Sequence, residues 1–132
     1  MPDNGLVSLQ SKVSTRATLD RLLAALAARG LTVFARIDHA AGAASVGLPL
    51  RPTEVVLFGN PKGGTVLMQD RQSSGLDLPL KALVWEDGAG KTWLTYNDPI
   101  WLAKRHGLGA ASAAAIKAMT GLLEAIAQEV AR

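Results

Sequence analysis

Apolar residues follow a helical period near the start of the chain. Four leucines are spaced i, i+3, i+4 and i+7, which is the stripe of a helix that packs on one side. Ser14 offers an N-cap hydroxyl before this stripe, and Gly30 suits the left-handed position that follows a helix. We therefore predict a helix over residues 15–29 whose stripe consists of Leu19, Leu22, Leu23 and Leu26.

Alternation of apolar and polar residues, or a short continuous apolar run, predicts strands elsewhere. The run 54–58 is bounded by Pro52 and Gly59 and is typical of a central strand that is buried on both faces. Alternation along 31–37 places Phe34 on one face together with Thr32 and Arg36. The opposite face of that strand consists of Leu31, Val33, Ala35 and Ile37. The predicted strands cover residues 6–13, 31–37, 54–58, 80–85 and 92–96.

Capping residues and prolines mark the remaining helices. Asn60 followed by Pro61 is an N-cap and a first helical residue, and the same order recurs at Asp98-Pro99. Gly107 ends the second of these helices. The predicted helices cover residues 61–71, 99–106 and 111–131, with a short helix or tight loop at 40–47, a loop at 73–79 and a hairpin turn at 86–91.

This order of elements predicts the fold class. A chain of 132 residues is long enough for one domain with a core of its own. Helices and strands are interleaved, and the clear hairpin lies near the end of the series. We therefore expect a single α+β domain over residues 1–132, with a mostly antiparallel or mixed sheet of about five strands and helices packed on one face.

Composition and charge narrow the classes of function. Fourteen basic and eleven acidic residues give a net charge of +3, and the longest basic run is Lys104-Arg105. Such dispersed charge argues against a nucleic-acid surface. The absence of cysteine excludes disulfides, thiol nucleophiles and cysteine-ligated metals, and it favours a reducing compartment. No targeting segment and no continuous apolar stretch of about 20 residues is present, so we expect a cytoplasmic protein that does not span a membrane.

Several phrases together resemble a known family. They are residues 30–41, Phe58-Gly-Asn-Pro-Lys62, Gly75-Leu-Asp-Leu-Pro-Leu-Lys81 and His106-Gly-Leu108. In this order and spacing the chain resembles the bacterial domain-of-unknown-function family 302 over about residues 14–108. The resemblance implies a small α+β domain of the TATA-binding-protein-like fold class and a homodimer. It implies no activity and no cofactor. The matching positions of functional interest are His39, Asn60, Pro61, Asp77, Pro79 and His106.

The candidate chemistry lies at the ends of elements, and each candidate has an alternative structural role. His39 ends a strand, where it is either a ligand contact or a side chain bonded to the backbone. Asn60 begins a turn that resembles a phosphate-holding loop but also suits a plain helix cap. His106 suits a C-terminal capping contact. A metal site made of His39, Asp77 and His106 has no spacing motif, so we expect none.

Two hypotheses for function follow. In the first, the domain binds a small ligand near the strand ends that carry His39, Asn60 and Asp77, with His106 as a further candidate and with catalysis left open. In the second, the domain is a homodimeric interaction module without catalytic activity. Apolar residues on both faces of the sheet favour an interface around Phe34 and Trp85, with at least about 1,000 Å² buried.

Overall fold

A computed structural model gives the structure of the protein and describes residues 4–132. Within this range five strands form one antiparallel sheet in the order β1-β5-β4-β3-β2. The predicted α+β class is confirmed, and every strand pair is antiparallel. The strands are β1 (Leu6–Ser11), β2 (Thr32–Asp38), β3 (Thr53–Gly59), β4 (Leu80–Glu86) and β5 (Thr92–Asn97).

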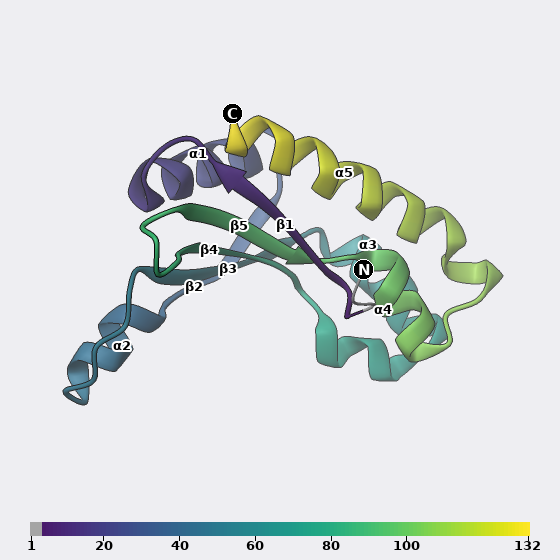
Figure 1. Cartoon of the computed structure of the whole chain (residues 1–132). Helices are drawn as coiled ribbons and strands as arrows, with labels where there is room; N and C mark the ends of the chain where they lie inside the picture. Colours follow the sequence, from purple (N-terminus) through teal and green to yellow (C-terminus); the bar gives the residue numbers. More distant parts are fainter. Residues whose placement is uncertain (1–3) are drawn as a thin grey trace.

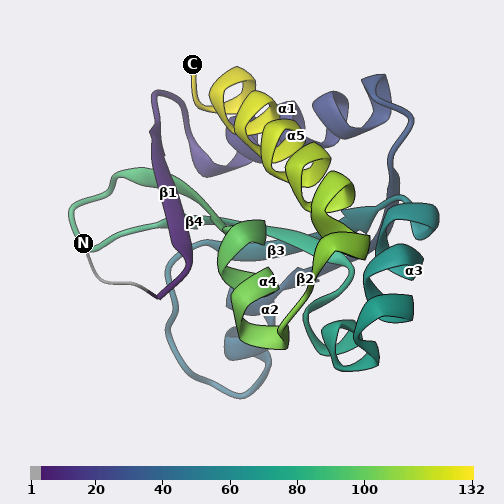
Figure 2. The same ribbon diagram turned by 90° about the vertical axis from the view of Figure 1, so that its right-hand side faces the viewer.

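Two helices cover one face of the sheet, as Figure 1 shows, and in Figure 2 the last helix crosses this face. They are α1 (Thr15–Ala28) and α5 (Ala113–Ala131). The other helices lie at the ends of the sheet, and the shortest one projects from the body of the molecule. These are α2 (His39–Ser45), α3 (Pro61–Asp70) and α4 (Pro99–His106), with 3₁₀ turns η1 (Gln72–Asp77) and η2 (Ala110–Ser112).

The core lies between α1, α5 and the covered face of the sheet, which we call the inner face. Alternate residues of the three central strands point into it, as the strand period requires. The buried inner-face residues are Val56, Phe58, Leu80, Ala82, Val84, Leu94 and Tyr96. The helices contribute buried side chains at helical spacing, among them Leu22, Leu26, Ile126 and Val130.

A β-bulge in β2 breaks the predicted alternation of that strand. Val33 pairs with Phe58, but after the irregularity between Val33 and Ala35 it is Arg36 that pairs with Val56. Residues opposite each other in an antiparallel pair share a face. Val33 and Arg36 therefore both lie on the inner face. The predicted common face of Leu31, Val33, Ala35 and Ile37 is wrong. The extra residue of the bulge exchanges the two faces of the strand, so that Ala35 lies on the face opposite to Val33.

The last helix has the length and composition of a membrane span. The segment Ala110–Ala131 has a mean hydropathy of 1.3 over its most apolar 18 residues. However, Leu123, Ile126 and Val130 are buried in the core cluster with the sheet. The packing of α5 against the sheet therefore accounts for the apolar stripe of this helix.

Candidate functional site

The structure does not bring the predicted site residues to one place. His39 is the first residue of α2, where it is exposed, and Asn60 follows β3. The antiparallel register pairs Thr32 with Gly59 and Asp38 with Glu54. His39 and Asn60 consequently lie at opposite ends of the sheet. The expected cluster of His39, Asn60 and Asp77 is wrong. His39 and Asn60 each follow the C-terminal end of a strand, and the C-terminal ends of two paired antiparallel strands lie at opposite ends of the sheet.

Asn60 caps α3. Its Oδ1 accepts a hydrogen bond of 3.0 Å from the amide of Lys62, and Pro61 occupies the first turn. The cap that the sequence indicated is therefore confirmed. Asn60 also lines a mainly apolar cavity of about 290 Å³, together with Phe34, Met68 and other side chains.

Asp77 and His106 form the centre of a group that we call the clamp, which consists of Ser73, Asp77, Arg105 and His106. Nε2 of His106 lies 2.5 Å from Oδ2 of Asp77, and since a carboxylate only accepts, this nitrogen carries the hydrogen. The Nδ1 atom lies 3.0 Å from Oγ of Ser73, and Arg105 reaches Oδ1 of Asp77 at 3.4 Å. The His106 side chain thus bonds to η1, and the expected contact with helix-end carbonyls does not occur.

The clamp joins η1 to the end of α4. A serine, a histidine and an aspartate in one chain of hydrogen bonds is also the composition of a hydrolytic triad. A general base has to reach its substrate, however, and the His106 side chain is only 6% exposed. Arg105 in addition shares the carboxylate of Asp77. We therefore assign the clamp a structural role.

A second carboxylate fastens the same region. Oδ2 of Asp70 accepts hydrogen bonds from the hydroxyl of Ser112 at 2.7 Å and from the amide of Gly109 at 2.9 Å. The Ser112 bond, and then the Gly109 bond, lowers the pKa of the Asp70 carboxyl below its ordinary value. Asp70 thereby ties the end of α3 to the turn that precedes α5.

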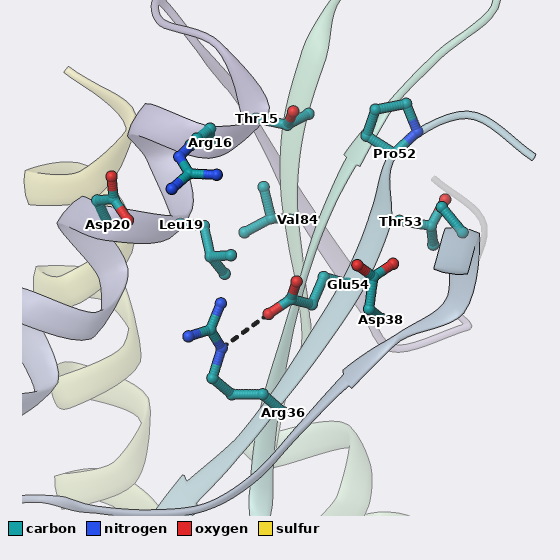
Figure 3. A pocket seen from close by; sticks show the side chains of 11 residues that line it. Thr15, Arg16, Leu19, Asp20, Arg36, Asp38, Pro52, Thr53, Glu54 and Val84 are labelled. Carbon is teal, nitrogen blue, oxygen red and sulfur yellow. Dashed lines mark hydrogen bonds and ion pairs between the residues drawn. The ribbon is translucent and has the colours of Figure 1, made fainter. Parts of the chain in front are cut away.

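A cavity of about 480 Å³ opens at the opposite end of the sheet, between α1 and the strands β2 and β3. We call it the charged cleft, and Figure 3 shows its lining from close by. It combines two arginines and three carboxylates with a few small and apolar side chains. The lining residues are Thr15, Arg16, Leu19, Asp20, Arg36, Asp38, Ala40, Pro52, Thr53, Glu54 and Val84.

Three charged side chains of the cleft lie on the inner face of the sheet, where Arg36 and Asp38 are exposed and Glu54 is half-buried. Arg36 pairs with Val56 and Glu54 pairs with Val84, so both charged side chains lie on the inner face. Asp38 is opposite Glu54 in the register and shares that face. The bulge in β2 is what turns Arg36 towards the helices.

Among the described residues, three of these five charged side chains have partners and the other two form no ion pair. Nε of Arg36 donates to Oε2 of Glu54 at 2.8 Å. Oδ1 of Asp38 accepts from the amide of Ala41 at 2.9 Å and caps α2. Within the described residues Arg16 and Asp20 form no ion pair. The cleft therefore offers free donors and acceptors to a bound molecule.

The sequence contained only a weak signal for this cleft. Its residues come from three strands, two helices and a segment next to β3, so no motif of fixed spacing connects them. The useful signal was a charged residue inside each of two strands, Arg36 and Glu54. Among residues 4–132, no group of three histidine, cysteine, aspartate or glutamate side chains has an arrangement that suits a metal ion.

Comparison with solved structures supports the fold. A crystal structure of an uncharacterised conserved DUF302 protein from Bacillus stearothermophilus superposes with a TM-score of 0.85. The superposition covers 98% of this chain and 99% of the other, at 18% sequence identity. At this identity the likeness concerns the fold.

Curated relatives match most of the chain at higher identity. The chain is 57% identical over 117 residues to proteins named "Fluoride-specific ion channel FluC 1" from Brucella suis biovar 1 (strain 1330) and Brucella abortus biovar 1 (strain 9-941). The match covers 89% of this chain but 46% and 43% of those proteins. The chain thus spans about half the length of the curated relatives it matches.

The sequence profile of one family matches nearly the whole chain. The match covers residues 7–126, which extends the resemblance noted above at both ends and includes most of α5. The chain belongs to the family described as domain of unknown function DUF302.

Proposed function

We propose that the domain binds a small polar molecule in the charged cleft. The observation that carries this proposal is the presence of Arg36, Asp38 and Glu54 on the inner face of the sheet, around open space of about 480 Å³. Sites for small molecules commonly have volumes of about 300–1,000 Å³. A structural role alone does not require the charge of Glu54, whose side chain is 17% exposed, because an apolar side chain at this position would extend the core.

A thermal-shift screen against metabolites tests this proposal. The screen includes acids, amines, amino acids, sugars and nucleosides. A ligand that binds only the folded state adds about 2.7 kcal/mol of stability at one hundred times its Kd. We expect at least one compound to raise the Tm of the wild type and to lose this effect in Glu54→Gln. Arg29→Gln is the matched control, because Arg29 is the C-cap residue of α1 but pairs with Glu129 outside the cleft.

Two outcomes would count against ligand binding in the cleft. One is a screen in which no compound raises the Tm. The other is a set of active compounds whose effect is the same in wild type, Glu54→Gln and Arg29→Gln.

We propose homodimer formation as a second function, which is independent of the first. Nine large apolar side chains are exposed in the described part of the chain, and six of them lie between residues 33 and 50. We call this segment the apolar arm; its exposed side chains are Val33, Phe34, Ile37, Val46, Leu48 and Leu50. The arm includes the edge strand β2 and the projecting helix α2 (Figure 1). An apolar edge of this kind favours pairing with a second copy.

Light scattering at micromolar concentration tests this second function. We expect the mass of a dimer for the wild type and of a monomer for Leu48→Asp, whose side chain is 62% exposed in the arm. Leu76→Asp is the control, because Leu76 is 73% exposed but lies in η1. A monomeric wild type, or a Leu48→Asp variant that remains dimeric, would contradict the role of the arm.

The Brucella relatives allow one extension of the ligand proposal. The activity in their name belongs to proteins about twice as long as the match. We assign the binding function to the part that is shared with this chain. The corresponding half of the Brucella protein should therefore bind the compound that this domain binds, which the same thermal-shift measurement checks.

A further inference from the structure

We infer that the ligand of the charged cleft is a free α-amino acid, a small zwitterion that carries one carboxylate and one ammonium group. This inference rests on the proposed binding function of the cleft. It comes from the positions of Arg16 and Asp38, which lie across the cavity from each other, while Arg36 and Glu54 form an ion pair within it.

The two arginines provide a place for the carboxylate. Figure 3 shows the guanidinium groups of Arg16 and Arg36 on the same side of the cleft, above and below Leu19. Arg36 uses Nε for Glu54, and its two terminal nitrogens have no hydrogen-bond partner among the described residues. Guanidinium groups bind carboxylates through paired N–H donors. A carboxylate between Arg16 and Arg36 would satisfy donors that are otherwise left to water.

Two of the three carboxylates, Asp38 and Glu54, provide a place for the ammonium group, whereas Asp20 lies on α1 with Arg16. Figure 3 shows the side chains of Asp38 and Glu54 next to each other, across the cleft from Arg16. Each has one oxygen without a hydrogen-bond partner among the described residues, since Asp38 caps α2 through Oδ1 and Glu54 binds Arg36 through Oε2. An ammonium group has three donors and no acceptor, so it suits a position between two such oxygens.

Apolar side chains lie between the two charged sides. Leu19 and Val84 line the cleft between Arg16 and Glu54 (Figure 3). They provide contact for the carbon atoms of a ligand whose ends are charged. A dianion would place its second charge against Asp38 and Glu54, and a dication would face both arginines. A zwitterion matches both sides at once, which is the usual basis of electrostatic specificity.

The experiment uses the whole chain and isothermal titration calorimetry. The twenty standard amino acids are titrated first. Each amino acid that binds is then compared with two analogues of the same carbon skeleton, one without the amino group and one without the carboxylate. We expect each analogue to bind at least roughly tenfold more weakly, because each one leaves charged groups of the cleft unpaired.

Two variants locate the binding groups. Arg16→Gln should weaken binding of the amino acid roughly tenfold, through loss of a charged donor to its carboxylate. Asp38→Asn should weaken it by a similar factor, and because asparagine is also a good N-cap, α2 keeps its start. Arg29→Gln, outside the cleft at the C-cap of α1, should leave the Kd unchanged.

The possible results separate this inference from the proposed function. If an analogue with one charge binds as well as the amino acid, the inference of a zwitterionic ligand is wrong and the binding function stands. The same conclusion follows if the metabolite screen finds ligands for the cleft but no amino acid binds. If neither the screen nor the amino acids give a ligand, both are wrong. Equal binding by Arg16→Gln and wild type would place the amino acid elsewhere.

Discussion

The clamp and the charged cleft contain similar side chains at opposite ends of the sheet, but their hydrogen bonding differs. In the clamp, both oxygens of Asp77 and both ring nitrogens of His106 have partners. In the cleft, Arg16 has no ion pair within the described residues and Arg36 uses one of its three nitrogens. Polar groups with complete sets of partners hold elements together. Groups with free donors and acceptors beside an open space are available to a ligand.

Removal of the clamp histidine should have the largest effect on stability. The His106 and Asp77 side chains are 6% and 15% exposed, so His106→Ala leaves a nearly buried carboxylate without its main partner. We expect the free energy of unfolding to fall by about 3 kcal/mol, as measured by urea denaturation. Asp77→Ala should have a similar cost. A loss of stability within the range of ordinary surface substitutions would show that the clamp does not hold η1 and α4 together.

Loss of the clamp serine should have a smaller effect. Ser73 is exposed and contributes one hydrogen bond, 3.0 Å long, to Nδ1 of His106. Ser73→Ala should lower the free energy of unfolding by about 1 kcal/mol, in the same urea experiment. Ser45→Ala is a suitable control on α2, where the serine hydroxyl bonds to a backbone carbonyl of its own helix. If both substitutions cost the same, the Ser73 bond adds nothing particular to the clamp.

The ion pair of the cleft should contribute less than the clamp. Arg36 and Glu54 are 2.8 Å apart, but the Arg36 side chain is 47% exposed. Exposed pairs of this kind are worth about 0.2–1 kcal/mol. A double-mutant cycle with Arg36→Gln and Glu54→Gln should give a coupling energy of about 0.5 kcal/mol. A coupling as large as the effect of His106→Ala would mean that the cleft, too, is a structural clamp.

The sequence predicted the elements well because their signals are local. The cap at Asn60 and the leucine stripe that starts at Leu19 each lie within one or two turns of helix, and the structure confirms both. The clamp was not predictable in this way, because Asp77 and His106 are 29 residues apart and meet only after α4 has packed against η1.

Prediction of the cleft from the sequence required the bulge in β2, which the pattern of residues does not indicate. A bulge adds one residue to β2 without any glycine or proline to mark it, and strict alternation then assigns Ala35 and Arg36 to the wrong faces. The sequence showed the charged residues Arg36 and Glu54 inside two strands, but it did not show that both lie on the same face of the sheet. Site prediction therefore failed at the step from sequence to strand register.

The smallest predicted effect concerns Asp70, beside the clamp, and its dependence on pH appears only in acid. The hydroxyl of Ser112 and the amide of Gly109 lower the pKa of the Asp70 carboxyl in the folded protein below its ordinary value of 3.8. The folded state therefore binds this proton less readily than the unfolded state does. The stabilisation from Asp70 is complete above the ordinary pKa and is lost as the pH falls through the lowered value.

Urea denaturation between pH 7 and pH 2.5 should thus show a stability difference between wild type and Asp70→Asn that is constant near neutral pH and shrinks below about pH 4. Ser112→Ala removes the larger cause of the lowered pKa, so the stability difference between this variant and wild type should shrink over the same pH range. A stability difference that is independent of pH would show that the Asp70 carboxylate does not hold the turn before α5.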